Sequence, residues 1–422
     1  MEVLLKYGHE TRRLTIGEAG LRVSVLSPGR TSGAEDEDSL IQSALAQPIG
    51  SPRLSRIVSP GQRVAILTAD ITRPCPSARL LPPLLQELRA AGIALRDITV
   101  IFGLGTHRAH TQEEQRALVG EEVFRQVRCI DSDPCRVERV GLTRRGTPID
   151  VFAPVLQAQV RVCLGVIEYH YFAGYSGGVK ALVPGVCAAS TIQHNHRRMT
   201  EPGAVAGRLD GNPVREDIEE AGELVGAHFI LNVVLDEAQR VVRAVAGHPR
   251  FAHRAGCAAL DAFGRASVPQ QADVVVVGAG GYPKDINLYQ AQKALDNARQ
   301  AVRPGGVLVL VAECPEGLGN RTFETWMKDP GGPDAILARI RQDFVLGGHK
   351  AAAVAMAMKQ ADIHLVSAIP AGLARALGFA AFGDPDTALA AALAKITPNP
   401  FVVVMPEGGS LLPSVVGTHQ EV

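Results

Sequence analysis

The sequence has no excess of charge of either sign. Its 43 Lys and Arg residues match 43 Asp and Glu residues in a chain of 422 residues. Proteins that bind nucleic acid or an acidic membrane surface usually carry a basic excess or a basic amphipathic segment, and this sequence has neither. We therefore expect no nucleic acid and no membrane among its partners.

Long apolar runs, a secretory signal and disulfide-type cysteine patterns are also missing. The longest apolar runs, at residues 274–279 and 305–312, have the length of strands and fall far short of a bilayer span. The N-terminal segment MEVLLKYGHETRR has no apolar core followed by a small-residue cleavage site. The seven cysteines form no C-x-x-C pair, which is typical of reduced thiols and not of a disulfide framework or a zinc ribbon. We expect a cytoplasmic protein.

The pattern that is present alternates between strands and helices. Apolar strands at 63–69 and 98–104 enclose a helical segment at 77–91, and this order predicts a parallel sheet. The chain is too long for one hydrophobic core, and a buried strand restarts at 273–278 after a polar stretch. We therefore predict an α/β protein with mostly parallel sheets in two domains, a catalytic and cofactor-tethering domain over 1–267 and a smaller α/β domain over 268–422.

Polar motifs follow the first two strands of the predicted sheet. DITRP spans residues 70–74 and GTHR spans residues 105–108. Ligands of parallel sheets bind beyond the carboxyl ends of the strands, where both motifs fall. Arg73 offers a bidentate fork for a carboxylate or phosphate, and Asp70 could orient it, bind a hydroxyl, or form a purely structural pair with it. His107 could transfer protons, although a lone histidine is more often structural.

A glycine-rich loop follows the strand at 160–167 and precedes a helix that begins near residue 188. His170 occupies a position after its strand similar to that of His107, so the two histidines could face each other across one cleft. Lys180 lies on the loop, which is not a Walker A sequence because the Gly-Lys pair and the following hydroxyl are missing. A lysine near buried aromatic side chains could have a lowered pKa and serve as a nucleophile or covalent tether, but an ordinary solvated lysine is the alternative.

Two further groups of residues are candidates. His194 and His196 lie two positions apart on a helix and point to different faces, so one of them could bind a metal more readily than both. Gln290 and Lys293 share a face of the helix predicted over 286–302, which could equally be a solvated face. The run VVVGAGG at 275–281 lacks the third glycine of a dinucleotide fingerprint and is a weak signal.

The combination of DITRP, GTHR and H-x3-G-Y-S-G-G-x-K-x3-P-G, with His196 downstream, resembles the nickel-dependent lactate racemase family. The spacings carry most of the information, because His170 precedes Lys180 by ten positions and Lys180 precedes His196 by sixteen. The resemblance implies an active site in a cleft between two α/β domains. It also implies a nickel-pincer nucleotide, a pyridinium mononucleotide with two thiocarboxyl arms.

The resemblance assigns a role to each candidate residue. Lys180 would hold the cofactor through a thioamide, and His196 would be the protein ligand of the nickel. His107 and His170 match the paired acid/base residues, and Arg73 matches the residue that binds the substrate carboxylate. The other cofactor contacts expected are Asp70, Thr72, Gly177 and Gly178, and the other substrate contacts are Tyr289, Gln290 and Lys293.

The implied reaction is racemisation or epimerisation of lactate or a related small 2-hydroxy acid by reversible hydride transfer. A histidine cannot deprotonate the weakly acidic C2 carbon directly, so a hydride acceptor is chemically reasonable. Proteins that make the cofactor would be partners. Two alternatives stay open: an NAD-dependent 2-hydroxy acid dehydrogenase that uses the Gly278 region, and a non-catalytic cofactor-binding homologue. The sequence leaves open which 2-hydroxy acid is used and whether His194 contributes.

Overall fold

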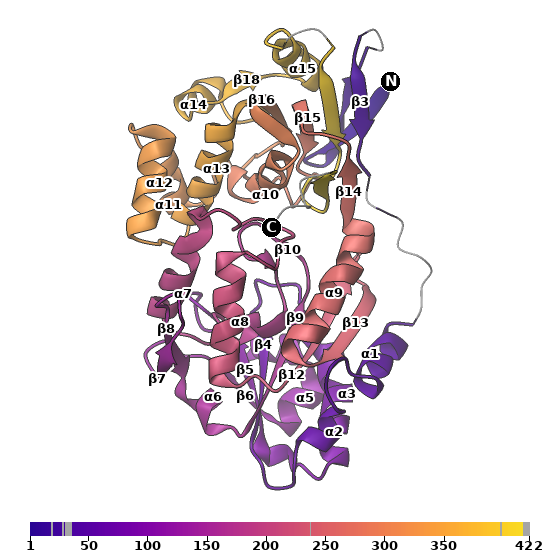
Figure 1. The fold of residues 1–422 in the computed structure, drawn as a ribbon, viewed down its shortest axis with the longest axis vertical. Helices are drawn as coiled ribbons and strands as arrows, with labels where there is room; N and C mark the ends of the chain where they lie inside the picture. The colour runs from indigo at the N-terminus through magenta and orange to yellow at the C-terminus, as the bar shows by residue number, and fades with distance from the viewer. Residues whose placement is uncertain (18–19, 28, 30–35, 237, 397–398, 417–422) are drawn as a thin grey trace. The chain divides into compact units, whose positions relative to one another are not determined.

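The chain forms two compact units (Figure 1), one within residues 31–261 and one that combines residues 1–30 with residues 262–422. The computed structural model describes residues 1–17, 20–27, 29, 36–236, 238–396 and 399–416. This division differs from the expected one, 1–267 and 268–422. The physical reason is a long-range pairing, because β3 (Arg22–Val25) lies parallel to β19 (Phe401–Met405) at the edge of the second sheet.

The unit within residues 31–261 is built on a six-stranded sheet in the order β13-β12-β9-β4-β5-β6. Its strands are β4 (Val64–Ala69), β5 (Ile98–Gly103), β6 (Arg128–Asp131), β9 (Val160–Val166), β12 (Phe229–Leu235) and β13 (Val241–Gly247). All neighbours are parallel except β12 and β13, which form an antiparallel pair at one edge. The predicted parallel sheet is confirmed.

Helices cover both faces of this sheet, because both faces of its strands are apolar. On β4, Val64 and Ile66 point into one core with the leucines of α3, while Ala65 and Leu67 point into a second core that includes Val225 of α8. The helices are α1 (Glu37–Ala46), α2 (Leu54–Ile57), α3 (Ser77–Ala90), α4 (Gln112–Val119), α5 (Glu121–Gln126), α6 (Ala153–Gln157), α7 (Ala189–His196), α8 (Pro213–Val225) and α9 (Pro249–Gly264).

Several short elements connect the main strands and helices of this unit. They are the hairpins β7 (Val137–Leu142) with β8 (Pro148–Phe152) and β10 (Tyr169–His170) with β11 (Gly174–Tyr175), and the 3-10 turns η1 (Leu95–Asp97), η2 (Gly178–Ala181) and η3 (Arg197–Thr200). The glycine-rich loop of the sequence therefore forms a small hairpin followed by one tight turn.

The other unit also contains a six-stranded sheet, in the order β18-β17-β16-β15-β19-β3, in which every pair is parallel. Its remaining strands are β15 (Ala272–Gly278), β16 (Val302–Val311), β17 (Ala361–Val366) and β18 (Ala380–Phe382). The hairpin of β1 (Glu2–Tyr7) and β2 (Glu10–Thr15) packs on one face together with α15 (Pro385–Leu393). Other helices are α10 (Leu288–Arg299), α11 (Arg321–Met327), α12 (Gly332–Gln342), α13 (Gly348–Gln360) and α14 (Ala371–Ala376).

Two expectations for this unit need correction. The helix predicted over 286–302 is shorter, because Asn287 caps α10 by accepting from the backbone N–H of Gln290 and the chain re-enters the sheet at Val302. The polar stretch after residue 264 contains a strand, β14 (Arg265–Val268), that pairs with β20 (Leu412–Val415). Within the part of the chain that the structure describes, no helix combines the length and apolar character that crossing a bilayer requires.

A buried carboxylate on α8 joins two other segments to that helix. Asp217 is 1% exposed and accepts hydrogen bonds from the hydroxyls of Thr143 at 2.5 Å and Thr147 at 2.7 Å, and from Nδ2 of Asn195 at 2.8 Å. The two threonines lie at the β7–β8 turn and Asn195 lies on α7. Asp217 therefore fixes α7 against α8.

Replacing Asp217 should destabilise the protein. Asp217→Ala leaves two hydroxyls and an amide without their acceptor, and we expect a loss of about 3 kcal/mol in the free energy of unfolding. Denaturant unfolding followed by circular dichroism measures the change. Glu223→Ala, at an exposed position of the same helix, is the control and should change stability by less than about 0.5 kcal/mol. Equal, small effects of both substitutions would contradict the role given to Asp217.

Candidate active site

The order of three strands brings the candidate residues to one edge of the sheet. Strand β4 lies between β9 and β5, and Arg73 follows β4 while His170 follows β9 and His107 follows β5 (Figure 1). Neighbouring strands are about 4.8 Å apart, so the ends of β9 and β5 are separated by roughly 10 Å. The turn that carries Arg73 thus lies between the two histidine-bearing loops.

His107 is paired with Asp70 in the turn after β4. Asp70 is 3% exposed, and its Oδ2 contacts Nδ1 of His107 while its Oδ1 accepts from the hydroxyl of Thr72 at 2.7 Å. Burial alone would raise the pKa of Asp70, but the hydrogen bonds from His107 and Thr72 outweigh it and lower that pKa. Because a carboxylate only accepts, Nδ1 donates and Nε2 of His107 keeps the lone pair.

This pairing decides among the alternatives for Asp70. The carboxylate orients His107 and not Arg73. Asp70 and Thr72 were both expected among the cofactor contacts, and the structure shows them holding each other and the imidazole.

Buried polar side chains form hydrogen bonds to the backbone of the glycine-rich loop. Asn232 on β12 accepts from the backbone N–H of Gly178 at 2.6 Å, and Nε2 of His253 on α9 donates to the carbonyl of Ser176 at 2.8 Å. Gly177 has a φ of +72°, and a Cβ there would lie 2.8 Å from Oδ1 of Asn232. The glycines therefore permit close packing of the loop onto the protein itself. Contact of Gly177 and Gly178 with a cofactor stays a prediction.

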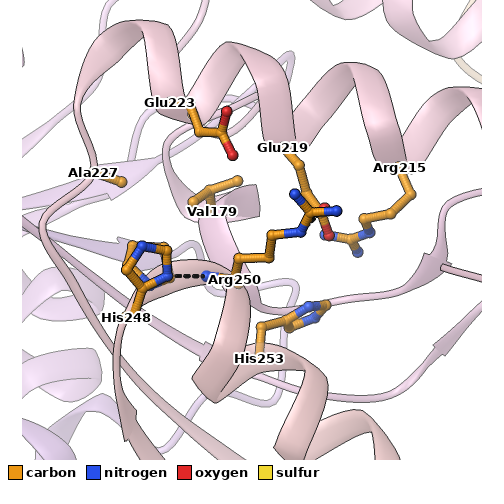
Figure 2. A pocket seen from close by; sticks show the side chains of 11 residues that line it. Val179, Arg215, Glu219, Glu223, Ala227, His248, Arg250 and His253 are labelled. Carbon is orange, nitrogen blue, oxygen red and sulfur yellow. Dashed lines mark hydrogen bonds and ion pairs between the residues drawn. The ribbon is translucent and has the colours of Figure 1, made fainter. Parts of the chain in front are cut away.

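A buried arginine completes the support. Arg215 on α8 is 1% exposed and donates to the carbonyls of Ala173, at 3.2 Å, and of Tyr175. Figure 2 shows Arg215 and Glu219 together at the wall of a pocket of about 60 Å³, with His253 nearby. Gly178 also lines this pocket, so a guanidinium cation lies just behind the loop that carries Lys180.

The surroundings of Lys180 and His170 disfavour positive charge. Burial, and then the charges of Arg215 and Arg73, hold the pKa of Lys180 well below its usual range. Burial, and then the charges of Lys180, Arg73 and His196, likewise hold the pKa of His170 well below its usual value. Their shared environment therefore favours the neutral form of each group. These mutual effects show that Arg73, His170, Lys180 and His196 lie in one region, so Lys180 is not an ordinary solvated lysine.

The orientation of His196 is also fixed. Its Nδ1 donates to Oδ1 of Asn195 at 2.9 Å, while the amide nitrogen of Asn195 donates to Asp217 and to the carbonyl of Val214. These hydrogen bonds fix the orientation of the Asn195 amide and put the ring proton of His196 on Nδ1. The lone pair is then on Nε2, and this tautomer is the one that binds a metal ion through Nε2. His194 instead donates from Nδ1 to the carbonyl of Ser190 one turn earlier in α7.

An aromatic ring links the two histidines of the loop region. The ring of Phe172 makes edge contacts with His170, at 4.5 Å between centroids, and with His196, at 4.9 Å. Among the residues that the structure describes, no three His, Cys, Asp or Glu side chains are grouped so that they could hold a metal ion. A metal bound to His196 would therefore take most of its ligands from a bound molecule, and the donor set fits a cofactor that carries its own ligands.

The three remaining candidates lie on α10 in the other unit. Lys293 is exposed, and Tyr289 and Gln290 are half-buried. Gln290 and Lys293 share a helix face, as expected from their spacing. Contact of these side chains with a substrate stays a prediction.

Several residues that build this site could not be identified from the sequence. Asn195, Asp217, Arg215 and His253 act through the backbone or through another side chain. Only Asn232 left a local signal, because it is the single polar residue in the otherwise apolar strand FILNVVL.

Comparison with known proteins gives one consistent family. The sequence models of the lactate racemase N-terminal and C-terminal domains match residues 7–207 and 268–412. The lactate racemase of Thermoanaerobacterium thermosaccharolyticum is 33% identical over 309 residues, 72% of this chain and 72% of that protein. The lactate racemase of Lactiplantibacillus plantarum is 32% identical over 307 residues, 71% of this chain and 72% of that protein.

Solved structures agree with this fold. The lactate racemase apoprotein of Thermoanaerobacterium thermosaccharolyticum superposes with a TM-score of 0.86 at 28% identity, over 98% of this chain and all of that one. A Thermotoga maritima protein of 18% identity has a TM-score of 0.63 over 91% of this chain and all of that one, which shows a shared fold alone. The expected architecture of mostly parallel α/β sheets is thus confirmed.

The packing under the glycine-rich loop predicts the effect of a single methyl group. Gly177→Ala should lower the free energy of unfolding by about 2 kcal/mol, because the new Cβ meets Asn232 and Ile167 and φ is positive. Gly141→Ala is a suitable control, since no atom lies within 4 Å of its Cβ position. Denaturant unfolding compares the two variants. Equal stability of Gly177→Ala and the unsubstituted protein would show that the loop is not held as described.

Proposed function

The chain belongs to the lactate racemase family and is an isomerase, a racemase, and we propose that it interconverts the enantiomers of lactate or a related small 2-hydroxy acid. The observation that supports the proposal best is the strand order, which places Arg73 between His107 and His170. Racemisation needs a proton-transfer group on each side of a flat intermediate. A carboxylate anchor between two imidazoles meets that need.

Arg73 is proposed to hold the substrate. It is exposed at the end of β4, and its guanidinium can form two parallel hydrogen bonds to a carboxylate. The bound carboxylate would offset the charge of Arg73, which is one of the charges that lower the pKa of His170. Substrate binding would therefore make it easier for His170 to carry a proton.

The two histidines would then exchange roles with the direction of reaction. Nε2 of His107 accepts the hydroxyl proton of one enantiomer, and Asp70 stabilises the imidazolium that results. The 2-keto acid formed is planar and is held by Arg73. When the other enantiomer is formed, His170 in its protonated form gives a proton to the oxygen and becomes neutral, so that one histidine gains a proton as the other loses one.

The cofactor proposed is the nickel-pincer nucleotide, which when bound supplies an acceptor that takes the C2 hydride and returns it. Lys180 fits the tethering role because its surroundings favour the neutral, nucleophilic form of its amine. His196 fits the role of nickel ligand because its tautomer is fixed by Asn195. Proteins that make this cofactor are the proposed partners.

The alternative of an NAD-dependent dehydrogenase has less support. A dinucleotide fingerprint needs a helix directly after the glycine turn. Strand β15 ends at Gly278, but α10 begins only at Leu288. The family assignment and this geometry both favour the racemase. Racemisation by protein loaded with cofactor would exclude a non-catalytic homologue.

Removal of either imidazole should abolish most of the activity. His107→Ala and His170→Ala should each lower kcat for lactate racemisation by about 100-fold or more in protein loaded with cofactor, because each removes a proton-transfer group. Polarimetry or chiral chromatography measures the rate in both directions. His9→Ala, at an exposed position of the other unit, should retain activity. Undiminished turnover of His107→Ala or His170→Ala would refute its acid/base role.

The tether is tested without any measurement of turnover. Protein co-expressed with cofactor-making enzymes should show a covalent mass increase, and Lys180→Ala should show none because the nucleophilic amine is missing. Intact-mass spectrometry gives the result. Lys293→Ala, a lysine of the other unit, should keep the mass increase and serves as the matched control. An adduct that persists in Lys180→Ala would place the attachment elsewhere.

A further inference from the structure

A second histidine in the loop after β5 connects the ends of three neighbouring strands. The side chain of His110 is 1% exposed. Its Nδ1 lies 2.7 Å from Oδ1 of Asp131, the last residue of β6, and its Nε2 lies 3.1 Å from the backbone nitrogen of Ile71, in the turn after β4. Strands β4, β5 and β6 are consecutive in the sheet, so one imidazole bridges all three ends.

The contacts of His110 determine its tautomer. The backbone N–H of Ile71 can only donate, so Nε2 of His110 accepts and the ring proton is on Nδ1. Asp131 accepts that proton and is itself held by the backbone N–H of His110 at 2.7 Å and by Nε2 of Gln115 at 3.0 Å. The ring also packs edge-on against Phe102, at 5.2 Å between centroids. His110 therefore has one orientation and one protonation pattern.

The turn that His110 contacts has little other support from packing. Ile71, Thr72 and Arg73 are all exposed, and the side chain of Ile71 does not enter a core. Within the turn, the N–H of Arg73 donates to the carbonyl of Asp70 at 3.1 Å, which fixes its shape but not its place. The loop after β5 sets the position of this turn through two contacts. His107 contacts the carboxylate of Asp70, and His110 accepts from the backbone N–H of Ile71.

We propose that His110 is a positioning residue that holds the turn bearing Asp70 and Arg73 at a fixed distance from His107. The substrate carboxylate and the hydroxyl proton would then meet their partners in one geometry. Displacements of about 1 Å can cost about 100-fold in rate, so such a device matters for catalysis even though His110 does not touch the substrate. The inference rests on the proposed function only where it names Arg73 as the carboxylate anchor.

Two substitutions separate the two hydrogen bonds of His110. His110→Asn keeps a donor near the position of Nδ1, toward Asp131, but is too short to reach Ile71. His110→Gln places its amide oxygen near the position of Nε2 and can still accept from Ile71. We expect the KM for lactate to rise about tenfold in His110→Asn, because Arg73 loses its fixed position, and to return close to that of the unsubstituted enzyme in His110→Gln.

A change in the neighbour should produce the same defect. In Asp131→Asn the new amide can donate to Nδ1 of His110, so that the ring proton moves to Nε2. Two N–H groups, those of Nε2 and of Ile71, then face each other, and the hydrogen bond between them is lost. We expect the same rise in KM as for His110→Asn, and a change in the imidazole nitrogen shifts in NMR spectra. The covalent mass increase at Lys180 should be unchanged in all three variants.

Hydrogen exchange at the backbone N–H of Ile71 tests the contact without activity. Exchange should be slow in the unsubstituted protein and in His110→Gln, and at least tenfold faster in His110→Asn. The inference is overturned if His110→Asn keeps both the KM and the slow exchange, or if both variants at residue 110 lose activity equally along with Tm. If the unsubstituted loaded protein racemises no 2-hydroxy acid, the proposed function fails, and exchange at Ile71 alone then decides whether His110 holds the turn.

Discussion

The constraint on which the rest of this site depends is a lysine amine held close to two arginine side chains, of which Arg215 is buried. Burial, Arg215 and Arg73 all act against a charge on Lys180, so the neutral, nucleophilic form of its amine is favoured. A buried guanidinium must itself be stabilised, and Arg215 is held by the carbonyls of Ala173 and Tyr175 at the start of the loop. The same hydrogen bonds that keep this cation in place therefore also shape the loop that presents Lys180.

The parallel sheet supplies the second requirement, a fixed arrangement of groups around a small substrate. Because carboxyl ends of parallel strands meet at one edge, the loops after β9, β4 and β5 bring His170, Arg73 and His107 together in that order. Each functional ring is then oriented by a neighbour, His107 by Asp70 and His196 by Asn195. The site is thus assembled by strand order first and by buried hydrogen bonds second.

Much of this could be predicted from the sequence where the signal is local. Apolar strands alternating with helices predicted the parallel sheet. The polar motifs DITRP and GTHR were correctly placed at strand ends, because a strand and the turn that ends it are adjacent in the chain. The family resemblance, drawn from the spacing of His170, Lys180 and His196, is confirmed.

Features that depend on distant residues could not be predicted. Asp70 adjoins Arg73 in sequence, yet its partner is His107, 37 positions away. The association of the first 30 residues with the C-terminal part depends on a pairing between β3 and β19 that no local pattern encodes. The buried residue Asp217 looks ordinary in the sequence, because its role comes from donors that the fold brings to it.

The most direct test of the account is the pH dependence of amine modification at Lys180 in the cofactor-free protein. Competitive labelling with an amine-selective reagent, read out by peptide mass spectrometry, reports the fraction of neutral amine at each pH. Lys180 should titrate well below the ordinary range of a lysine, and it should therefore be modified at a lower pH than an exposed lysine. Titration of Lys180 in the same range as an exposed lysine such as Lys359 would contradict it.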